Sequence, residues 1–255
     1  MQLGSSPVIL ETRSLSKEFD GVRAVDSVSL SVTGGLLTAL IGPNGAGKTT
    51  LFNLVSGTVR PSGGKVLYKG RDITGEPAWK ISQYGIARSF QITNVFPNLS
   101  VVENIRLSAQ SRIRPRFDLW SAPEKYKVAL EKTGRIIAEM RLQGRELMLA
   151  SMLSHGDQRK LEIAMTLAQD PELMLLDEPT AGVAIQEIPE LMAVIRSIKE
   201  QRRCTILLVE HKMDVVMGLS DRIVVMNDGK VIAEGAPSEV QANSLVQDVY
   251  LGRAA

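Results

Sequence analysis

Eight consecutive residues carry the clearest chemistry in this sequence. They are Gly42-Pro43-Asn44-Gly45-Ala46-Gly47-Lys48-Thr49, and they match the phosphate-loop pattern G-x-x-x-x-G-K-[ST] at every fixed position. In such a loop, successive backbone N–H groups surround phosphate oxygens at a helix N-terminus, where the helix dipole favours anions. Lys48 would reach the β- and γ-phosphates, and the Thr49 hydroxyl would bind Mg²⁺. The pattern predicts a nucleotide site without saying which reaction it serves.

The residues on either side are suited to position this loop. Leu36–Ile41 is a short apolar run typical of a buried strand, and Thr49–Val55 has the composition to open a helix. A chance glycine-rich loop would rarely combine its glycines with a Lys-Thr pair and a preceding strand. We therefore interpret the segment as a strand, a phosphate loop and a helix in succession.

A pair of adjacent carboxylates follows a second apolar run, Leu173–Leu176. Asp177 would hold Mg²⁺ through water, and Glu178 would polarise the attacking water as general base. An ordinary strand end can also carry two carboxylates, but the phosphate loop upstream favours nucleotide hydrolysis.

Composition argues against several other classes of protein. The chain has 255 residues, and its formal net charge of +2 gives no electrostatic reason to expect nucleic acid as a partner. The single cysteine, Cys204, excludes an internal disulfide and fits a reducing compartment. Because it precedes the apolar run Thr205–Val209, we expect it to be buried rather than reactive. The N-terminus does not resemble a signal peptide, and no apolar run approaches the roughly 18 residues of a membrane span. We expect a soluble chain whose membrane role, if any, comes through a partner.

Strand-like and helical patterns alternate along most of the chain. The expected strands are Val8–Leu15, Val22–Val32, Leu36–Ile41, Lys65–Tyr68, Leu173–Leu176, Thr205–Val209, Arg222–Met226 and Lys230–Glu234. Helices are expected at Pro77–Tyr84, Gln186–Glu200 and Asp214–Leu219 and in a tail through Tyr250. This alternation predicts an α/β fold with a parallel sheet. From a capping box at Ser100 to about Ala150 the pattern is helical instead, which indicates a helical insertion at roughly 92–153.

Several further motifs occur in an order that resembles one large family. They are Gln91 after Ser89-Phe90, the run Leu153-Ser154-His155-Gly156-Asp157, and His211 after the strand that ends in Glu210. With the phosphate loop and the Asp177-Glu178 pair, they resemble the ATP-binding cassette (ABC) ATPases over nearly the whole chain. The resemblance implies a single domain, residues 1–255, of the α/β class. Its P-loop NTPase (RecA-like) core, with a parallel sheet and an antiparallel β subdomain, would comprise about 1–91 and 154–255. A helical signature-motif subdomain would span 92–153.

The resemblance also implies roles for individual residues. The phosphate loop from Gly42 through Thr50 would bind ATP, and Phe19 would stack on the adenine. The implied magnesium ligands are Thr49, Gln91 and Asp177, and the implied catalytic residues are Glu178, His211 and Gln91. Gln91 would also link the core to the helical lobe, and His211 would contact the γ-phosphate. Surface glutamines are common and a lone histidine is more often structural, but a histidine directly after a strand of this sheet would lie at its ligand-binding edge.

Ser154 has two compatible interpretations. In the family, two ATP molecules lie between the phosphate loop of one subunit and the signature loop of the other, in a head-to-tail dimer. Ser154 and Gly156 would then bind the γ-phosphate of the partner's ATP, because they lie at a helix N-terminus. The alternative is a plain capping box, with Ser154 as N-cap and Asp157 at the third helical position.

Three departures from the common family pattern narrow the resemblance. His155 and Asp157 stand where the family usually has Gly and Gln, and the loop after Glu178 ends in Ala184 rather than Asp. A contact normally made across the dimer by that Asp cannot be assigned here. The chain looks like the branched-chain amino acid importer subfamily at four places, which are Leu153–Arg159, Ala181-Gly182, Val209–His211 and the end Val249–Gly252.

This resemblance implies the ATPase subunit of a bacterial importer for branched-chain or related amino acids, peripheral on the cytoplasmic face of the inner membrane. Its partners would be transmembrane permease subunits and a second ATPase subunit, either itself or a sister chain. The alternatives are the ATPase of a related urea or amide importer or a lipopolysaccharide exporter, a soluble ABC protein of DNA repair or translation, and a P-loop kinase or GTPase. Soluble ABC proteins usually carry coiled-coil inserts or a second cassette, and kinases and GTPases lack the signature loop.

The segment 91–99 is the candidate docking edge for the permease. Its apolar residues Val95, Phe96 and Leu99 follow the hinge glutamine, and apolar side chains in such a loop can receive a partner helix. Packing within the helical lobe would explain the same residues equally well.

Overall fold

The structure is a computed structural model that describes residues 7–89, 95–110 and 122–251, without the side chains of 122–126, 250 and 251. The strands are β1 (Val8–Phe19), β2 (Val22–Thr33), β3 (Leu37–Ile41), β4 (Gly63–Tyr68), β5 (Arg71–Asp72), β6 (Ile86–Arg88), β7 (Leu173–Asp177), β8 (Thr205–Val209), β9 (Arg222–Asn227) and β10 (Lys230–Gly235). The α-helices are α1 (Lys48–Val55), α2 (Ala78–Tyr84), α3 (Val101–Gln110), α4 (Ala122–Glu139), α5 (His155–Leu167), α6 (Ile188–Glu200), α7 (Met213–Leu219), α8 (Pro237–Ala242) and α9 (Ser244–Leu251), with a 3₁₀ turn at Ala150–Met152.

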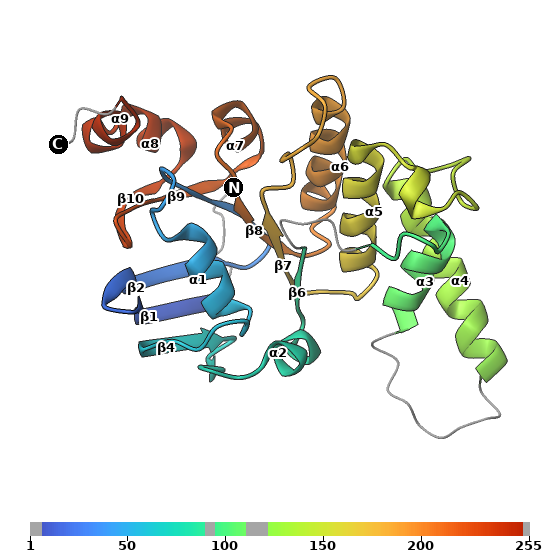
Figure 1. Cartoon of the computed structure of the whole chain (residues 1–255), viewed down its shortest axis with the longest axis horizontal. Helices are drawn as coiled ribbons and strands as arrows, with labels where there is room; N and C mark the ends of the chain where they lie inside the picture. The colour runs from blue at the N-terminus through green and yellow to red at the C-terminus, as the bar shows by residue number, and fades with distance from the viewer. Residues whose placement is uncertain (1–6, 90–94, 111–121, 252–255) are drawn as a thin grey trace.

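A six-stranded sheet in the order β10-β9-β3-β8-β7-β6 forms the centre of the molecule (Figure 1). Five of its strands run parallel, and β10 pairs antiparallel to β9 at one edge. Every residue of β3, β7 and β8 is buried, as expected for parallel strands covered on both faces. The expected α/β fold is confirmed.

A second sheet, in the order β2-β1-β4-β5, is antiparallel throughout. The turns Asp20-Gly21 and Asp228-Gly229 both have positive φ at their two central residues, which matches the right-handed twist of the strands they join. Asp-Gly is a residue pair that favours turns of this type. Strand β2 lies beside the β9–β10 turn, since the Asp26 N–H donates to the Gly229 carbonyl at 2.9 Å. The Gly229 N–H in turn donates to the carbonyl of Ala46, in the phosphate loop, at 3.2 Å.

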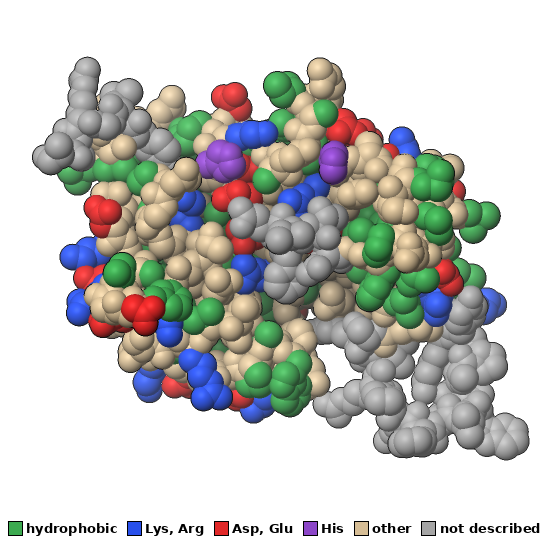
Figure 2. Space-filling view, viewed as in Figure 1, with side chains coloured by type: hydrophobic (Ala, Val, Ile, Leu, Met, Phe, Trp, Pro, Cys, Tyr) green, Lys and Arg blue, Asp and Glu red, His purple; other side chains and the backbone are tan. Residues whose placement is uncertain are grey.

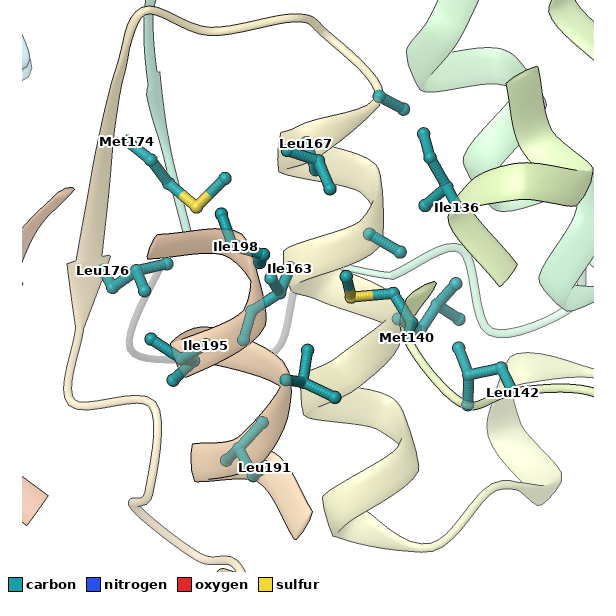
Figure 3. Close-up of a cluster of buried hydrophobic side chains, with 14 of the residues drawn as sticks. Ile136, Met140, Leu142, Ile163, Leu167, Met174, Leu176, Leu191, Ile195 and Ile198 are labelled. Atoms are coloured by element: carbon teal, nitrogen blue, oxygen red, sulfur yellow. The ribbon is translucent and has the colours of Figure 1, made fainter. Parts of the chain in front are cut away.

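The two faces of the central sheet pack on different layers. Along β7, Met174 and Leu176 face α5 and α6, whereas Leu173 and Leu175 join the core that contains α1. Figure 3 shows the first of these cores, in which side chains of β7, α5 and α6 meet Ile136, Met140 and Leu142 from the helical insertion. The insertion is therefore packed onto the core and shares its apolar interior.

The helical expectation for the insertion is wrong after Glu139. Helix α4 ends at Glu139, and the chain then continues through turns to the 3₁₀ turn at residue 150. Arg141 and Gly144 both have positive φ, at 55° and 79°, a conformation that a continuing α-helix does not allow. The buried side chains of Met140 and Leu142 nevertheless keep the segment on the core, which explains the helix-like apolar spacing. Within the described residues, no helix is long and apolar enough to cross a membrane.

Candidate functional site

The candidate site lies where three parallel strands end side by side. Leu40 of β3 and Asp177 of β7 are both in register with Val209 of β8. The segments that follow these strands therefore leave the sheet at the same edge, which is where ligands bind in open α/β sheets. The phosphate loop, the Asp177-Glu178 pair and His211 are brought together there from distant parts of the sequence.

Two glycines of the phosphate loop are required by close contacts and by backbone conformation. A Cβ on Gly42 would lie 2.1 Å from the Met226 carbonyl oxygen, and one on Gly47 would lie 2.3 Å from that of Ala24. Both have positive φ, at 152° and 94°. Gly47 is the N-cap of α1 and no side chain caps this helix, so its first-turn N–H groups are available to an anion. Thr49 is exposed and Thr50 half-buried in that first turn.

Lys48 is held against its own loop. Its Nζ donates to the carbonyl oxygens of Gly42 and Pro43, both at 2.8 Å. Burial lowers the pKa of Lys48, while the charges of Glu178 and Asp177 act in the opposite direction. The Lys48 ammonium thus feels the charges of both carboxylates. If phosphate oxygens replaced its two carbonyl partners, their negative charge would offset the cost of burying the ammonium.

Asp177 has the features of a metal-binding carboxylate. It is 1% exposed, and one oxygen, Oδ2, accepts from Arg88 at 2.7 Å. Its other oxygen, Oδ1, is buried without a hydrogen-bond partner, and such orphaned acceptors are rare unless a ligand or water completes them. Among the described residues, no group of three or more His, Cys, Asp or Glu side chains could hold a metal ion. Mg²⁺ commonly binds one or two carboxylates together with substrate phosphates, and these residues fit that arrangement.

Glu178 has a strained backbone. Its φ of 46° lies in the left-handed region, where a non-glycine residue is uncommon and costs on the order of 1 kcal/mol or more. The conformation is held by the Glu178 N–H, which donates to the Val209 carbonyl at 2.9 Å. His211 Nδ1 lies 4.0 Å from the Glu178 carboxylate, and the imidazole is half exposed. The strain therefore places Glu178 beside His211 at the open edge of the sheet.

Glu210 is a structural member of the site that the sequence analysis named only as a strand end. Its carboxylate is fully buried and accepts the N–H groups of His211 and Lys212 at 2.8 and 3.2 Å. Its other oxygen accepts the Thr180 N–H at 3.2 Å and the Thr180 hydroxyl. It thereby fixes the segments after β7 and β8 to each other. The sequence carries one sign of this role, which is a carboxylate directly after the largely apolar strand β8.

Phe19, the residue expected to stack on the adenine, lies on the described surface of the molecule. Phe19 is 44% exposed at the end of β1, with the Lys17 ammonium 4.7 Å from its ring centroid. It pairs with Val22 at the start of β2, the strand that contacts Gly47 through Ala24. Gln91 lies outside the described residues. Figure 2 shows both histidines of the chain, His155 and His211, on the same face of the molecule.

In the signature loop, a carboxylate of the same chain, that of Glu187, contacts Ser154 and Gly156. Ser154 is the N-cap of α5 and its Oγ accepts the Asp157 N–H at 3.2 Å, as the capping interpretation requires. The same hydroxyl donates to Glu187 Oε1 at 2.6 Å, and the Gly156 N–H donates to Glu187 Oε2 at 3.3 Å. A carboxylate of this chain therefore lies on the two groups expected to bind a phosphate. The contact between Glu187 and Ser154 joins residues that are far apart in the chain, so no sequence pattern predicts it.

Asp157, one of the departures from the family pattern, forms two ion pairs. Its carboxylate lies 2.8 Å from Arg145 and 2.6 Å from Lys160, and Lys160 also contacts Glu190 at 3.2 Å. These pairs join the signature helix to the helical insertion on one side and to α6 on the other. Among the described residues, no hydrogen bond or ion pair joins Ser154 or Gly156 to the phosphate loop.

Comparison with known families agrees with this arrangement. The sequence profile described as ABC transporter matches residues 25–181, which is more than half of the chain. The chain belongs to the ABC transporter family. A second profile, described as branched-chain amino acid ATP-binding cassette transporter, matches residues 230–255. As an ABC ATPase, the chain binds and hydrolyses ATP.

Curated relatives and solved structures of the family match over the whole length. The chain is 37% identical to the high-affinity branched-chain amino acid transport ATP-binding protein BraF of Pseudomonas aeruginosa, over 96% of this chain and 98% of BraF. It is 37% identical to LivG of Salmonella typhimurium, a protein described in the same way, over 98% and 100% of the two chains. The ADP conformation of the ABC transporter cassette MJ1267 superposes with a TM-score of 0.82 at 29% identity, covering 97% and 100%.

Proposed function

We propose that this ABC ATPase energises the import of branched-chain amino acids or closely related solutes. The observation that carries the proposal is the end-to-end similarity to BraF and LivG, which includes the C-terminal segment matched by the branched-chain amino acid profile. In this proposal the chain is a peripheral subunit at the cytoplasmic face of the inner membrane, bound to transmembrane permease subunits. Hydrolysis would drive the permease between outward- and inward-open states.

The proposed catalytic roles are those that the family resemblance implies, and the positions of Lys48, Asp177 and Glu178 support them. Lys48 and the N–H groups from Gly42 to Thr50 hold the phosphates, and Phe19 stacks on the adenine. Thr49, Asp177 and Gln91 are the proposed ligands of Mg²⁺, which would neutralise phosphate charge when bound. Glu178 accepts the proton of the attacking water, and His211 contacts the γ-phosphate.

The proposed working unit is a head-to-tail dimer, homomeric or formed with a sister ATPase. Ser154 and Gly156 of each subunit bind the γ-phosphate held by the other. The proposed domain organisation is a single cassette, with residues 1–91 and 154–255 as core and 92–153 as the helical subdomain that meets the permease.

The test is transport in proteoliposomes. The chain would be purified with the permease subunits and, where required, a sister ATPase and solute-binding protein, and ATP-dependent uptake of radiolabelled leucine, urea and an amide compared. Leucine uptake that stops in a Glu178→Gln variant is expected. Uptake of urea or the amide alone would overturn the proposed solute, and failure of the chain to co-purify with membrane subunits would favour a soluble role.

A further inference from the structure

Arg88 is a buried cation that the roles described above do not use. Its side chain is 8% exposed, at the end of β6. One terminal nitrogen, Nη2, donates to Asp177 Oδ2 at 2.7 Å. The other, Nη1, donates to Asn53 Oδ1 at 2.7 Å and to Ser56 Oγ at 2.8 Å. A guanidinium is well suited to this task, because its planar fork donates in fixed directions to several acceptors at once.

The partners of Arg88 belong to the elements that carry the proposed magnesium ligands. Asp177 is itself one of them, and Asn53 lies one helical turn after Thr49 on α1. The third proposed magnesium ligand, Gln91, follows Arg88 by three residues in the chain. The guanidinium carbon also lies 5.7 Å from the ring centroid of Phe52, a fully buried residue of α1. One side chain thus connects β7, α1 and the strand that leads to the hinge.

We propose that Arg88 is a positioning residue that holds the magnesium ligands in register. By engaging Oδ2, it orients the Asp177 carboxylate so that the unpartnered Oδ1 remains for the metal's water shell. By holding Asn53, it fixes the first turns of α1 relative to Asp177. The inference rests on the proposed magnesium site and adds a residue to it that no family motif named above contains.

A second interpretation predicts the opposite result. If Arg88 served only to neutralise Asp177, removing its charge would leave the site more negative and would strengthen Mg²⁺ binding. If Arg88 positions the ligands, removing it weakens Mg²⁺ binding in spite of the added negative charge. Residues that orient metal ligands typically change metal affinity by about 10- to 100-fold when mutated.

The experiment measures ATP binding by calorimetry in Mg²⁺ and in EDTA, for wild type, Arg88→Met, Arg88→Lys and Asn53→Ala. The ratio of the two affinities reports the metal's contribution and is insensitive to a general loss of folded protein. Asn53→Ala keeps the Arg88–Asp177 pair and removes one of the contacts to α1, since the Ser56 hydroxyl still accepts from Nη1 at 2.8 Å, so it is the milder variant should Arg88→Met fail to fold. Arg203→Met is the matched control, since Arg203 pairs with Glu139 at 2.7 Å just before β8, at the opposite edge of the sheet.

We expect the magnesium-dependent gain in ATP affinity, which is the ratio of the affinities in Mg²⁺ and in EDTA, to fall about tenfold or more in Arg88→Met. It should fall by a smaller factor in Asn53→Ala and Arg88→Lys, with binding in EDTA and the Arg203 control unchanged. A magnesium-dependent gain in ATP affinity equal to or above that of wild type in Arg88→Met, or in Arg88→Lys where Arg88→Met does not fold, would overturn the inference. Absence of any gain in wild type would instead refute the magnesium site itself, and the inference with it.

Discussion

At the scale of single residues, Glu178 is the most informative side chain. The left-handed backbone of Glu178 is maintained by a hydrogen bond to β8 and places its carboxylate near His211. Strain at one residue is tolerated when its surroundings fix it, and it is found most often where chemistry needs a particular geometry. The conformation therefore supports the role of general base independently of the motif.

Replacing Glu178 by Gln should allow ATP binding and prevent its cleavage. Glutamine keeps the size and the hydrogen bonds of glutamate but cannot accept a proton. If the chain pairs with itself, the variant should accumulate as an ATP-bound dimer on size-exclusion chromatography. Asp177→Asn should instead weaken Mg²⁺-dependent binding and leave the dimer unpopulated. Substantial ATP turnover by Glu178→Gln would rule out Glu178 as the general base. If the variant is a monomer without turnover, the experiment is repeated with a sister ATPase added.

Lys48→Ala should abolish ATP hydrolysis and weaken nucleotide binding while the fold persists. The lysine is the compact cation aimed at the γ-phosphate, and losing one such electrostatic contact costs on the order of 10²-fold or more in rate. Its two hydrogen bonds to Gly42 and Pro43 also hold the loop, so a small loss of thermal stability is expected. Hydrolysis at the wild-type rate would remove the phosphate-loop assignment.

Cys204 should be chemically inert in the folded protein. It is buried, and burial raises the pKa of its thiol to about 12. The thiol stays protonated at pH 8, so alkylation by iodoacetamide should be slow in buffer and fast in urea. Because the folded pKa lies above the unfolded value near 9, this group contributes stability that is lost as pH rises through that interval. Rapid alkylation of the native protein would contradict the buried placement.

At the scale of elements, α5 and α6 form a unit that presents the signature loop. Glu187 precedes α6 and occupies the Ser154 hydroxyl and the Gly156 N–H. A bound γ-phosphate from a partner subunit would have to displace this carboxylate. Closure of the proposed dimer therefore includes the exchange of an internal anion for an external one.

Ser154→Ala and Glu187→Ala should separate the two roles of the loop. The first removes a helix cap, at a cost of about 1 kcal/mol in stability, and one phosphate donor, so ATP-driven dimerisation should be impaired. The second leaves the cap intact and frees both donors, so dimerisation of a Glu178→Gln background should require less ATP. His155→Gly should retain activity.

The measurements are thermal unfolding, hydrolysis and light scattering with MgATP. If Ser154→Ala loses stability alone, the capping box explains the motif. If Glu187→Ala requires more ATP, its carboxylate stabilises the closed state and is not a competitor.

Much of the architecture follows from local patterns. The largely apolar runs of β3, β7 and β8 predict buried parallel strands, and Asp-Gly pairs favour both hairpin turns. The phosphate loop is readable because its chemistry depends on consecutive residues. Contacts between distant segments are not readable in this way, which is why Glu187 on Ser154 and Arg88 on Asp177 appear only in the structure. The end of α4 was misplaced because the buried Met140 and Leu142 extend an apolar spacing beyond the last helical turn.

At the scale of the whole molecule, the loop residues 95–99, which precede α3, belong to the proposed docking edge for the permease. The side chain of Asn104, fully buried, accepts the Phe96 N–H at 2.8 Å and donates to the carbonyls of Phe96, Leu99 and Ser100. The backbone of the loop is thus fixed to the helical lobe, while the Phe96 ring is 51% exposed and Val95 packs on the core. Local packing and docking accordingly involve different parts of the same loop.

Phe96→Asp should therefore uncouple the ATPase from its membrane partner without disturbing the fold. An exposed aromatic ring on a fixed backbone is suited to enter a partner's apolar groove, and a carboxylate there would have to be desolvated on binding. Basal hydrolysis by the isolated subunit should change little, because Phe96 is not among the residues proposed to bind phosphate. Pull-down with the permease subunits should lose most of the complex. Trp79→Asp is the matched control, since Trp79 is a 65% exposed aromatic on α2, outside the helical lobe. Unchanged assembly of Phe96→Asp, or equal loss in Trp79→Asp, would show that Phe96 is not the docking residue and that the loop serves the packing of its own lobe.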